Sequence, residues 1–375
     1  MNVNVFLAEL RAIEVEFFAG VPDSLLKPLC DYLIENFGIS SKHVITANEG
    51  NAVATAAGYH LATGKVPLVY LQNSGLGNVV NPVTSLITER VYAIPTVFVV
   101  GWRGEPGVHD EPQHEFQGEL TLEILKSMDV SVFVVEKDIS NIEFKQAVVN
   151  FKKELDKGKS VAFVVRKDAL SYNSNNKFVN SFPLKREEII EEILSFSEKD
   201  LVVATTGKTS REVFEIREKN NNSHKQDFLT VGSMGHCSSI AFGMAMSVPT
   251  KRVWCIDGDG SALMHLGSMA TLGSSSTENI IHVLINNEAH ESVGGQPTVA
   301  NRINFKEIAN GCGYNRTYSV ENLDDLRSSL QEIKHEKGPI FIEIKSSIGS
   351  RKDLGRPTLT PTENKRLFMD YIKES

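Results

Sequence analysis

The chain has 375 residues, of which 41% are hydrophobic and 23% charged, and this composition is ordinary for a globular protein with two domains or one large one. The formal net charge is -8 and no long basic tract is present, so we expect no nucleic-acid partner. No apolar run reaches the ~18 residues of a membrane-spanning helix, so we expect no membrane partner.

The N-terminal segment and the cysteines predict a cytoplasmic protein. Residues 1–18 carry acidic side chains and no basic region ahead of their apolar part, which is not typical of a secretory signal. The cysteines Cys30, Cys237, Cys255 and Cys312 are widely spaced and form no CxxC pair. We therefore expect reduced thiols, with neither a disulfide framework nor a zinc site.

Apolar runs alternate with helix-like segments through the first half of the chain. We expect strands at 16–20, 43–48, 67–72, 95–102, 131–136 and 161–167. Continuous runs of Val, Ile, Leu and Phe are typical of strands that are buried on both faces of a parallel sheet. Strands separated by helical segments predict βαβ units.

Glu49 stands where the second of these strands meets a helix of small residues that ends at Gly64. A carboxyl group in an apolar cleft has a raised pKa and can stay protonated near neutral pH, as a hydrogen-bond donor must. A glutamate in the first turn of a helix is also favoured by the helix dipole alone. The residue by itself leaves both interpretations open.

The pair Gly75 and Gly77 after the third predicted strand suggests a dinucleotide-binding loop at first sight. The third glycine of that fingerprint is missing, because Val80 stands in its place. No acidic residue ends the next strand, which reads VFVVGW. The dinucleotide fingerprint is therefore not met.

Residues 171–184 are polar and rich in Asn and Ser, which predicts a linker. The second half repeats the alternation of the first. We expect strands there at 201–207, 228–233, 253–258, 280–287, 316–320 and 339–345. The predicted fold class is therefore α/β, with two doubly wound parallel-sheet domains at 1–170 and 185–375.

Hard oxygen ligands follow two of the strands in the second half. One strand leads into the letters DGDGS, and the next ends in NN. Gly258 and Gly260 let backbone amides approach a ligand closely, and Asp259 and Asn287 offer carboxylate and amide oxygens. Together these groups suit Mg²⁺ and a diphosphate better than a simple turn and a helix cap.

DGDGS followed at this spacing by NN resembles the signature of thiamine-diphosphate enzymes. The resemblance implies that Mg²⁺ is held by the side chains of Asp259 and Asn287 and by the backbone carbonyl of Ala289. It also implies cofactor contacts from Gly258, Gly260 and Ser261.

Three further segments resemble the same family. TTGKTS resembles the diphosphate loop, with Gly207 and Thr209 as contacts. VGSMG resembles the segment beneath the cofactor, where Gly232 makes contact and Met234 forces thiamine into its bent form. Taken alone, Met234 would be interpreted as core filling. Glu49 matches a glutamate of the family. The resemblance implies that this residue activates the cofactor through the cofactor's aminopyrimidine ring.

Decarboxylases of this family usually carry a central third domain, whereas this chain has only the short linker. The layout resembles the two-domain decarboxylases of phosphonopyruvate and sulfopyruvate, and the segments GVPDSLLKPL, GEPGVHDEPQHEFQG and NNEAHESVGGQPT match them. The fused chain and GVHDEPQH make the phosphonopyruvate enzymes the closer resemblance. It implies non-oxidative conversion of 3-phosphonopyruvate to phosphonoacetaldehyde and CO₂ in phosphonate biosynthesis, for example of 2-aminoethylphosphonate.

The resemblance also implies a histidine proton donor in the loop after VFVVGW. His114 is our first candidate and His109 the second. The alternative is that both are ordinary surface-loop residues, or that the segment HDEPQH binds an adventitious metal.

A phosphonate-bearing substrate needs a local basic pocket, because the chain as a whole is acidic. Ser24 and Lys208 are the leading candidates, ahead of Arg103, Arg211 and Arg302. Each cation could equally be a solvated surface charge. Simple pyruvate decarboxylases place a glutamate several residues after NN, where this chain has glycine, so the roles of Glu291 and His290 are not transferred.

Glu49 and Asp259 lie in different predicted domains. In the family the cofactor bridges two subunits, which implies a homodimer or a higher homo-oligomer with the cofactor at the subunit interface. The alternative functions are sulfopyruvate decarboxylase, a related carboligase that adds to another carbonyl, and an inactive cofactor-binding paralogue. Glu49, Asp259 and Asn287 are all present, which argues against inactivity.

Overall fold

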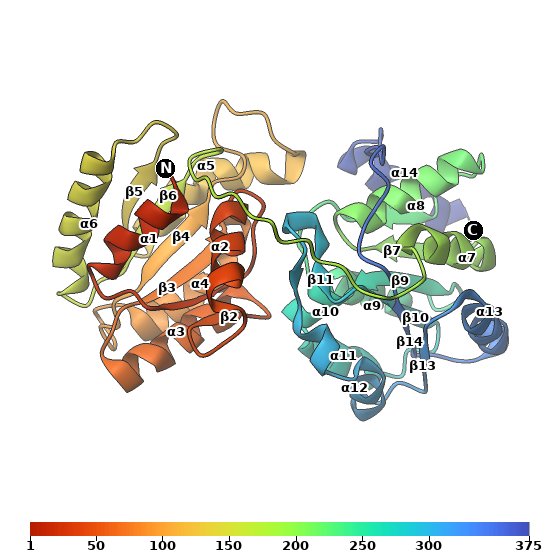
Figure 1. The fold of residues 1–375 in the computed structure, drawn as a ribbon. Helices are drawn as coiled ribbons and strands as arrows, with labels where there is room; N and C mark the ends of the chain where they lie inside the picture. Colours follow the sequence, from red (N-terminus) through yellow and green to blue (C-terminus); the bar gives the residue numbers. More distant parts are fainter. Residues whose placement is uncertain (375) are drawn as a thin grey trace. The chain divides into compact units, whose positions relative to one another are not determined.

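The computed structural model describes residues 1–374, and the chain divides into two compact units, Met1–Lys177 and Phe178–Ser375. In each unit, helices cover both faces of one sheet (Figure 1). The predicted α/β class with doubly wound parallel sheets is confirmed, and no third compact unit occurs within the described chain.

The sheet of the first unit has six parallel strands in the order β2-β1-β3-β4-β6-β5. They are β1 (Phe17–Gly20), β2 (His43–Ile45), β3 (Pro67–Gln72), β4 (Val97–Gly101), β5 (Ser131–Val135) and β6 (Val161–Val165). Each lies inside one of the predicted apolar runs. Strands β4 and β6 are buried at every residue, which explains why their sequences are apolar without alternation.

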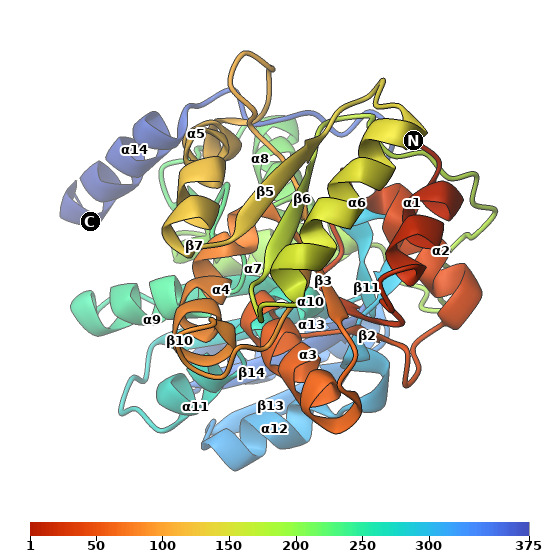
Figure 2. The ribbon, with the colours of Figure 1, turned by 90° about the vertical axis from the view of Figure 1, so that its left-hand side faces the viewer.

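The helices of the first unit form two layers. One layer contains α1 (Val3–Arg11), α2 (Lys27–Phe37) and α6 (Asn141–Leu155), which Figure 2 shows along one side of the sheet. The other layer contains α3 (Glu49–Thr63), α4 (Leu76–Pro82) and α5 (Pro112–Ser127). Helix α3 begins after Asn48, whose side chain accepts the N–H of Asn51, and it ends at Gly64 in the left-handed conformation, as predicted.

The sheet of the second unit has the order β13-β14-β10-β9-β7-β8, again all parallel. Its strands are β7 (Leu201–Ala204), β8 (Asp227–Leu229), β9 (Val253–Gly258), β10 (Ile280–Asn286), β13 (Arg316–Val320) and β14 (Ile340–Lys345). Counted from one within each unit, both sheets have the order 2-1-3-4-6-5. The two halves therefore share one topology although their sequences do not visibly repeat.

The helices of the second unit also lie on both faces. One layer contains α7 (Arg186–Ser197), α8 (Lys208–Lys219) and α13 (Leu323–Glu332). The other contains α9 (Cys237–Ser247), α10 (Asp259–Met264), α11 (Gly267–Gly273), α12 (Phe305–Cys312) and α14 (Pro361–Glu374). The short hairpin of β11 (Ala289–His290) and β12 (Gln296–Pro297) was not predicted.

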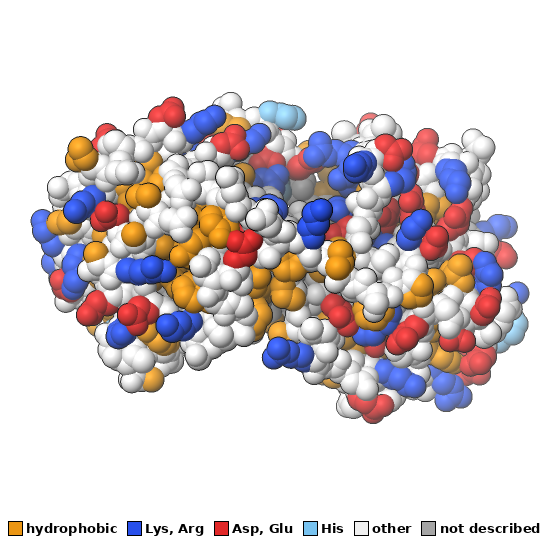
Figure 3. All heavy atoms as spheres, in the orientation of Figure 1, with side chains coloured by type: hydrophobic (Ala, Val, Ile, Leu, Met, Phe, Trp, Pro, Cys, Tyr) orange, Lys and Arg blue, Asp and Glu red, His pale blue; other side chains and the backbone are white. Residues whose placement is uncertain are grey.

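The charges on the surface and the lengths of the helices are relevant to possible binding partners. On the face drawn in Figure 3, side chains of Lys and Arg are interspersed with those of Asp and Glu over both units. Within residues 1–374, every helix is too short or too polar to cross a membrane.

The loops at the carboxyl ends of the parallel strands, where ligands bind in open α/β sheets, carry most of the predicted site residues.

Candidate functional site

Three predicted motifs of the second unit meet at Ser261, in the first turn of α10. The hydroxyl of Thr205, directly after β7, donates to Ser261 Oγ at 3.0 Å. The backbone N–H of Gly235, just before α9, donates to the same oxygen at 3.2 Å. The segments TTGKTS, VGSMG and DGDGS therefore lie side by side at the carboxyl edge of this sheet.

The start of α8 is suited to an anion. Gly207 precedes the helix with φ 86° and ψ -133°, a conformation that residues with a Cβ avoid. In the described chain, no side chain caps the first turn of α8. The backbone N–H groups of this turn, among them those of Lys208 and Thr209, therefore have no capping partner. Uncapped amides at the positive end of a helix favour a phosphate group.

Asp259 is a buried carboxyl group at the first residue of α10, directly after β9. Thr298 Oγ1 donates to its Oδ2 at 2.6 Å, and the backbone amides of Asn287 and Gly260 also face it. Burial raises the pKa of Asp259 to about 7, against the opposing effect of these bonds. A buried carboxyl group that lacks a neighbouring cationic side chain is suited to a bound metal ion.

Asn287 and Ala289 supply further oxygens beside Asp259. The side-chain oxygen of Asn287 accepts the N–H of Ala289 at 3.1 Å, in a tight turn after β10. Pro297 stands opposite Ala289 in the β11–β12 hairpin and has no N–H to donate to the Ala289 carbonyl. Carboxylate, amide oxygen and backbone carbonyl form a donor set that fits Mg²⁺.

Glu291 connects this turn to two helices. Its carboxylate accepts hydrogen bonds from Lys208 Nζ at 2.7 Å, Arg186 Nη1 at 2.7 Å and Asn287 Nδ2 at 2.8 Å. Burial opposes ionisation, but Arg186 and Lys208 hold the pKa of Glu291 below its ordinary value. The structure thus pairs Lys208, a predicted substrate contact, with Glu291.

The glycine-rich segments leave one apolar side chain uncovered. Met234 is 36% exposed, which argues against the core-filling interpretation. A Cβ built on Gly260 would lie 3.4 Å from Met234 Cε, so the Met234 side chain lies over the DGDGS turn. A Cβ on Gly258 would meet nothing within 4 Å, and Gly232 lies half-buried in the loop after β8.

In the first unit, Glu49 is the first residue of α3 and is only 4% exposed. Burial raises its pKa, and a hydrogen bond of 2.7 Å from Asn78 Nδ2 to Glu49 Oε2 opposes that shift. A Cβ on Gly75 would lie 2.4 Å from Glu49 Oε1, so the carboxyl group packs directly on the Gly75 backbone. Glu49 is therefore a confined carboxyl group that favours its protonated form.

A second group of polar residues lies at the carboxyl ends of β1, β3 and β4. Arg103 donates to Ser24 Oγ at 3.0 Å and forms an ion pair with Asp110. His114 Nδ1 lies 3.4 Å from Gln72 Nε2, and burial together with nearby Arg103 lowers the pKa of His114. His109, by contrast, is exposed. Ser24 and His114 thus both lie in the neighbourhood of Arg103.

Sequence reasoning missed the residues that hold these groups in place. Asn78 belongs to the GLGN segment, in which sequence reasoning assigned it no role, and Thr298 ends the segment QPT. Arg186 lies 105 residues from its partner Glu291. Such partners are set by tertiary packing, and no local pattern indicates them.

A buried polar cluster lies beneath the DGDGS turn. Cys255, Asp257 and His282 place possible ligand atoms within 4.8 Å of one another. Asp257 Oδ2 and His282 Nε2 are 3.6 Å apart, and neither atom has a hydrogen-bond partner in the described chain. The cysteines form no disulfide, although Cys237 Sγ and Cys255 Sγ are 3.6 Å apart.

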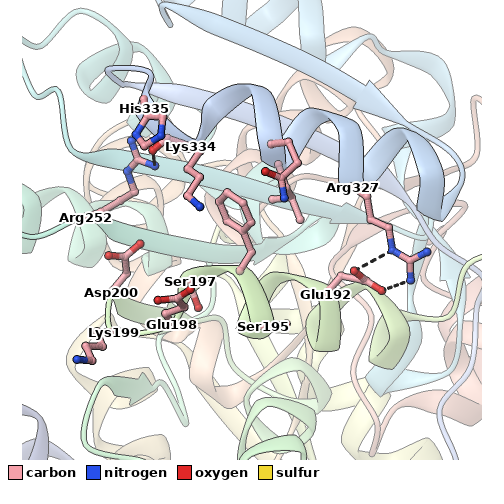
Figure 4. Close-up of a pocket in the computed structure, with 13 residues that line it drawn as sticks. Glu192, Ser195, Ser197, Glu198, Lys199, Asp200, Arg252, Arg327, Lys334 and His335 are labelled. Carbon is pink, nitrogen blue, oxygen red and sulfur yellow. Dashed lines mark hydrogen bonds and ion pairs between the residues drawn. The ribbon is translucent and has the colours of Figure 1, made fainter.

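A pocket of about 730 Å³ opens at the other edge of the second sheet (Figure 4). Lys199 and Asp200 precede β7, and Arg252 precedes β9, so the pocket lies at the amino ends of the strands. Glu192 and Arg327 form an ion pair in its wall. Because the Asp259 group is at the carboxyl edge, this pocket is separate from the candidate site.

Two family models match the chain. One describes the N-terminal TPP (thiamine pyrophosphate) binding domain of thiamine pyrophosphate enzymes and matches residues 2–126. The other describes the C-terminal TPP binding domain of these enzymes and matches residues 205–344. The first range includes Glu49, and the second includes Asp259 and Asn287.

Three curated relatives match nearly the whole chain. A phosphonopyruvate decarboxylase of Streptomyces viridochromogenes is 32% identical, over 98% of this chain and 94% of the relative. One of Streptomyces hygroscopicus is 33% identical, over 100% of this chain and 94% of the relative. A sulfopyruvate decarboxylase of Methanosarcina acetivorans is 24% identical, over 97% of this chain and 95% of the relative.

Proposed function

The chain belongs to the thiamine pyrophosphate enzyme family, alongside phosphonopyruvate decarboxylases, and from this premise we propose that it decarboxylates 3-phosphonopyruvate with thiamine diphosphate and Mg²⁺. The products are phosphonoacetaldehyde and CO₂, within phosphonate biosynthesis. The observation that carries the proposal is the full-length match at 32% and 33% identity, against 24% for the sulfopyruvate enzyme of comparable length. Fold alone would not choose between them.

The second unit would hold the diphosphate and the metal. Asp259, Asn287 and the Ala289 carbonyl fit Mg²⁺ by their donor chemistry. The diphosphate would meet the start of α8 and the turns around Ser261, with contacts assigned to Gly207, Thr209, Gly232, Gly258 and Gly260. Met234, exposed beside Gly260, would support the thiamine from below.

Thiamine diphosphate, when bound, supplies the carbon nucleophile and the electron sink that loss of CO₂ requires. The chain supplies the proton chemistry. Burial raises the pKa of Glu49, which favours a proton on its carboxyl group, and Asn78 and Gly75 fix the direction in which that group points. A protonated Glu49 can donate a hydrogen bond to a ring nitrogen of the cofactor.

A second proton must reach the product carbon after CO₂ leaves. We assign this step first to His114, which lies half-buried near Gln72 and Arg103, and second to the exposed His109. Ser24 remains the candidate for a substrate contact at this edge, since its oxygen accepts from Arg103 and its own O–H is left to donate. Lys208 is the second candidate, since one of its three N–H groups is used on Glu291 and the others are left to donate.

We also propose a cytoplasmic homo-oligomer, a homodimer or larger, with the cofactor at the subunit interface. The proposal is supported by the division of the cofactor residues, since Glu49 lies in one unit and Asp259 in the other. Cysteines without disulfides fit a reducing compartment.

A substrate panel tests the proposal. The purified protein with thiamine diphosphate and Mg²⁺ would be offered 3-phosphonopyruvate, sulfopyruvate and pyruvate, and kcat/KM would be measured from CO₂ release. We expect the highest value for phosphonopyruvate. A preference for sulfopyruvate would keep the reaction type and replace the substrate, and no release from any acid by cofactor-loaded protein would reject a decarboxylase.

A further inference from the structure

The carboxylate of Glu291 is a meeting point for three structural elements of the second unit. Oε1 accepts from Lys208 at the start of α8, which follows the diphosphate loop. Oε2 accepts from Arg186 at the start of α7 and from the side chain of Asn287 after β10. The Glu291 side chain is 8% exposed, so water competes little for these bonds.

The bond to Asn287 fixes the orientation of an amide. A side-chain amide has a donor end and an acceptor end of nearly equal size, and packing alone does not tell them apart. A carboxylate only accepts, so the NH₂ group of Asn287 must face Glu291. The oxygen is then directed to the other side, where it accepts the N–H of Ala289.

The network is balanced in charge, which keeps Glu291 a carboxylate. Arg186 and Lys208 contribute two positive charges, and Glu212 and Glu291 contribute two negative ones. Glu212 accepts two hydrogen bonds from Arg186, at 2.6 and 2.8 Å, and none of its bonds reaches Asn287. Glu212 therefore shares the network with Glu291 without sharing the contact to the amide.

We propose that Glu291 is a positioning residue for magnesium binding, because it turns the amide oxygen of Asn287 toward the metal. It also links that ligand to Lys208, beside the diphosphate loop. The inference rests on the proposed function, in which Asn287 binds Mg²⁺. A glutamine at this position can present its NH₂ group to Asn287, which removes the acceptor that sets the direction of that amide. It can otherwise turn the NH₂ group toward Lys208, which breaks the link between Asn287 and the start of α8.

The test compares two isosteric substitutions in one network, Glu291→Gln and Glu212→Gln. Mg²⁺ is titrated calorimetrically into each variant and the wild type in saturating thiamine diphosphate. We expect Glu291→Gln to weaken Mg²⁺ binding by roughly 10- to 100-fold, as for residues that orient metal ligands, and Glu212→Gln to stay within about twofold. With Mn²⁺ as the probe, the EPR spectrum of the bound ion should change in Glu291→Gln only.

A fallback keeps the test decisive if Glu291→Gln does not fold. Glu291→Asp retains the negative charge for Arg186 and Lys208 but withdraws the carboxylate from Asn287 by one methylene. It should therefore fold and still bind Mg²⁺ about tenfold more weakly.

The two proposals fail in different ways. Wild-type protein that binds no Mg²⁺ with thiamine diphosphate would overturn the proposed cofactor chemistry. Wild-type binding with an unchanged affinity in the Glu291 variants, or an equal loss in Glu212→Gln, would overturn the positioning role alone.

Discussion

Glu49 shows how packing sets the chemistry of a single residue. Within residues 1–374 it has no cationic partner, the neutral amide of Asn78 donates to it, and burial raises its pKa. The backbone of Gly75 lies where any larger residue would displace the carboxyl group. Confinement and a retained proton are what a hydrogen-bond donor to the cofactor needs.

Replacement of Glu49 by glutamine should remove the proton while preserving shape. We expect Glu49→Gln to lower kcat by roughly 10²- to 10⁴-fold, the usual range for a proton-transfer group, with Mg²⁺-dependent cofactor binding retained. The measurement is the rate of CO₂ release at saturating substrate. Glu16→Gln, in an exposed ion pair with Lys65, is the control, and a Glu49→Gln rate within a few-fold of wild type would remove Glu49 from the mechanism.

Two neighbouring glycines offer a matched pair. A Cβ at Gly75 would lie 2.4 Å from Glu49 Oε1, whereas a Cβ at Gly77 would meet nothing within 4 Å. Gly75→Ala should displace Glu49 and lower kcat by about 100-fold, comparable to a misplaced catalytic group, while Gly77→Ala should leave the rate unchanged. Equal rates for the two variants would show that the contact with Gly75 does not position Glu49.

At the residue scale, the sequence predicted the groups that follow strands directly and missed the groups that hold them. Asp259, Asn287 and Glu49 stand at strand ends, where a local pattern indicates them. Their partners are remote: Asn78 lies 29 residues from Glu49, and Thr298 lies 39 residues from Asp259. Only folding brings such pairs together.

The adjacent strands β9 and β10 carry a buried polar contact in the middle of an apolar sheet. Asp257 and His282 are both fully buried, and Asp257 Oδ2 lies 3.6 Å from His282 Nε2. The other ring nitrogen of His282 lies 3.0 Å from the hydroxyl of Tyr314. The contact ties the strand that leads to Asp259 to the strand that leads to Asn287.

Loss of one partner of this contact should destabilise the second unit. His282→Leu leaves Asp257 Oδ2 buried without the polar ring beside it, which should cost about 1–3 kcal/mol of unfolding free energy. The measurement is urea unfolding followed by fluorescence. The double variant Asp257→Asn with His282→Leu removes the carboxyl group as well and should recover part of the loss. A single variant as stable as wild type would show that the contact does not stabilise the sheet.

His43, at the start of β2, gives the first unit a dependence on pH. Its ring nitrogens lie 2.7 Å from the Gly38 carbonyl and 2.9 Å from the Tyr70 hydroxyl. Burial lowers its pKa from 6.5 to about 4, so the unfolded chain takes up the proton first as pH falls. The contribution is thus fully present above pH 6.5 and is lost as pH falls toward 4.

This contribution can be isolated by substitution. Between pH 7 and pH 5 the wild type should lose about 2 kcal/mol of unfolding free energy through His43, which His43→Gln should not lose. Urea unfolding at the two pH values measures the difference. Identical losses in the two proteins would mean that His43 titrates alike in the folded and unfolded states.

At the element scale, the burial of a strand determined whether the sequence could predict it. All twelve strands of the two sheets overlap predicted apolar runs, because parallel strands covered by helices are apolar at nearly every position. The strands β11 and β12 were missed because each has only two residues, too few for a pattern. Yet that hairpin carries Ala289 and places Pro297 opposite it.

Over the whole molecule, one topology occurs twice with different chemistry at its carboxyl edge. The first unit carries a buried carboxyl group with a raised pKa and histidines, and the second carries the oxygens proposed to bind Mg²⁺ and uncapped helix amides. The proposed reaction uses residues of both sets, so it requires both units. The sequence indicated the repeated layout only through its similar strand count, since the two sheets bury different side chains.

The most direct test of the proposed function is phosphorus NMR of 3-phosphonopyruvate incubated with cofactor-stripped protein, before and after addition of thiamine diphosphate and Mg²⁺. We predict no change without the cofactors and conversion to phosphonoacetaldehyde once both are present. Conversion without them, or no phosphonoacetaldehyde with both bound, would contradict thiamine-dependent decarboxylation of phosphonopyruvate by this protein.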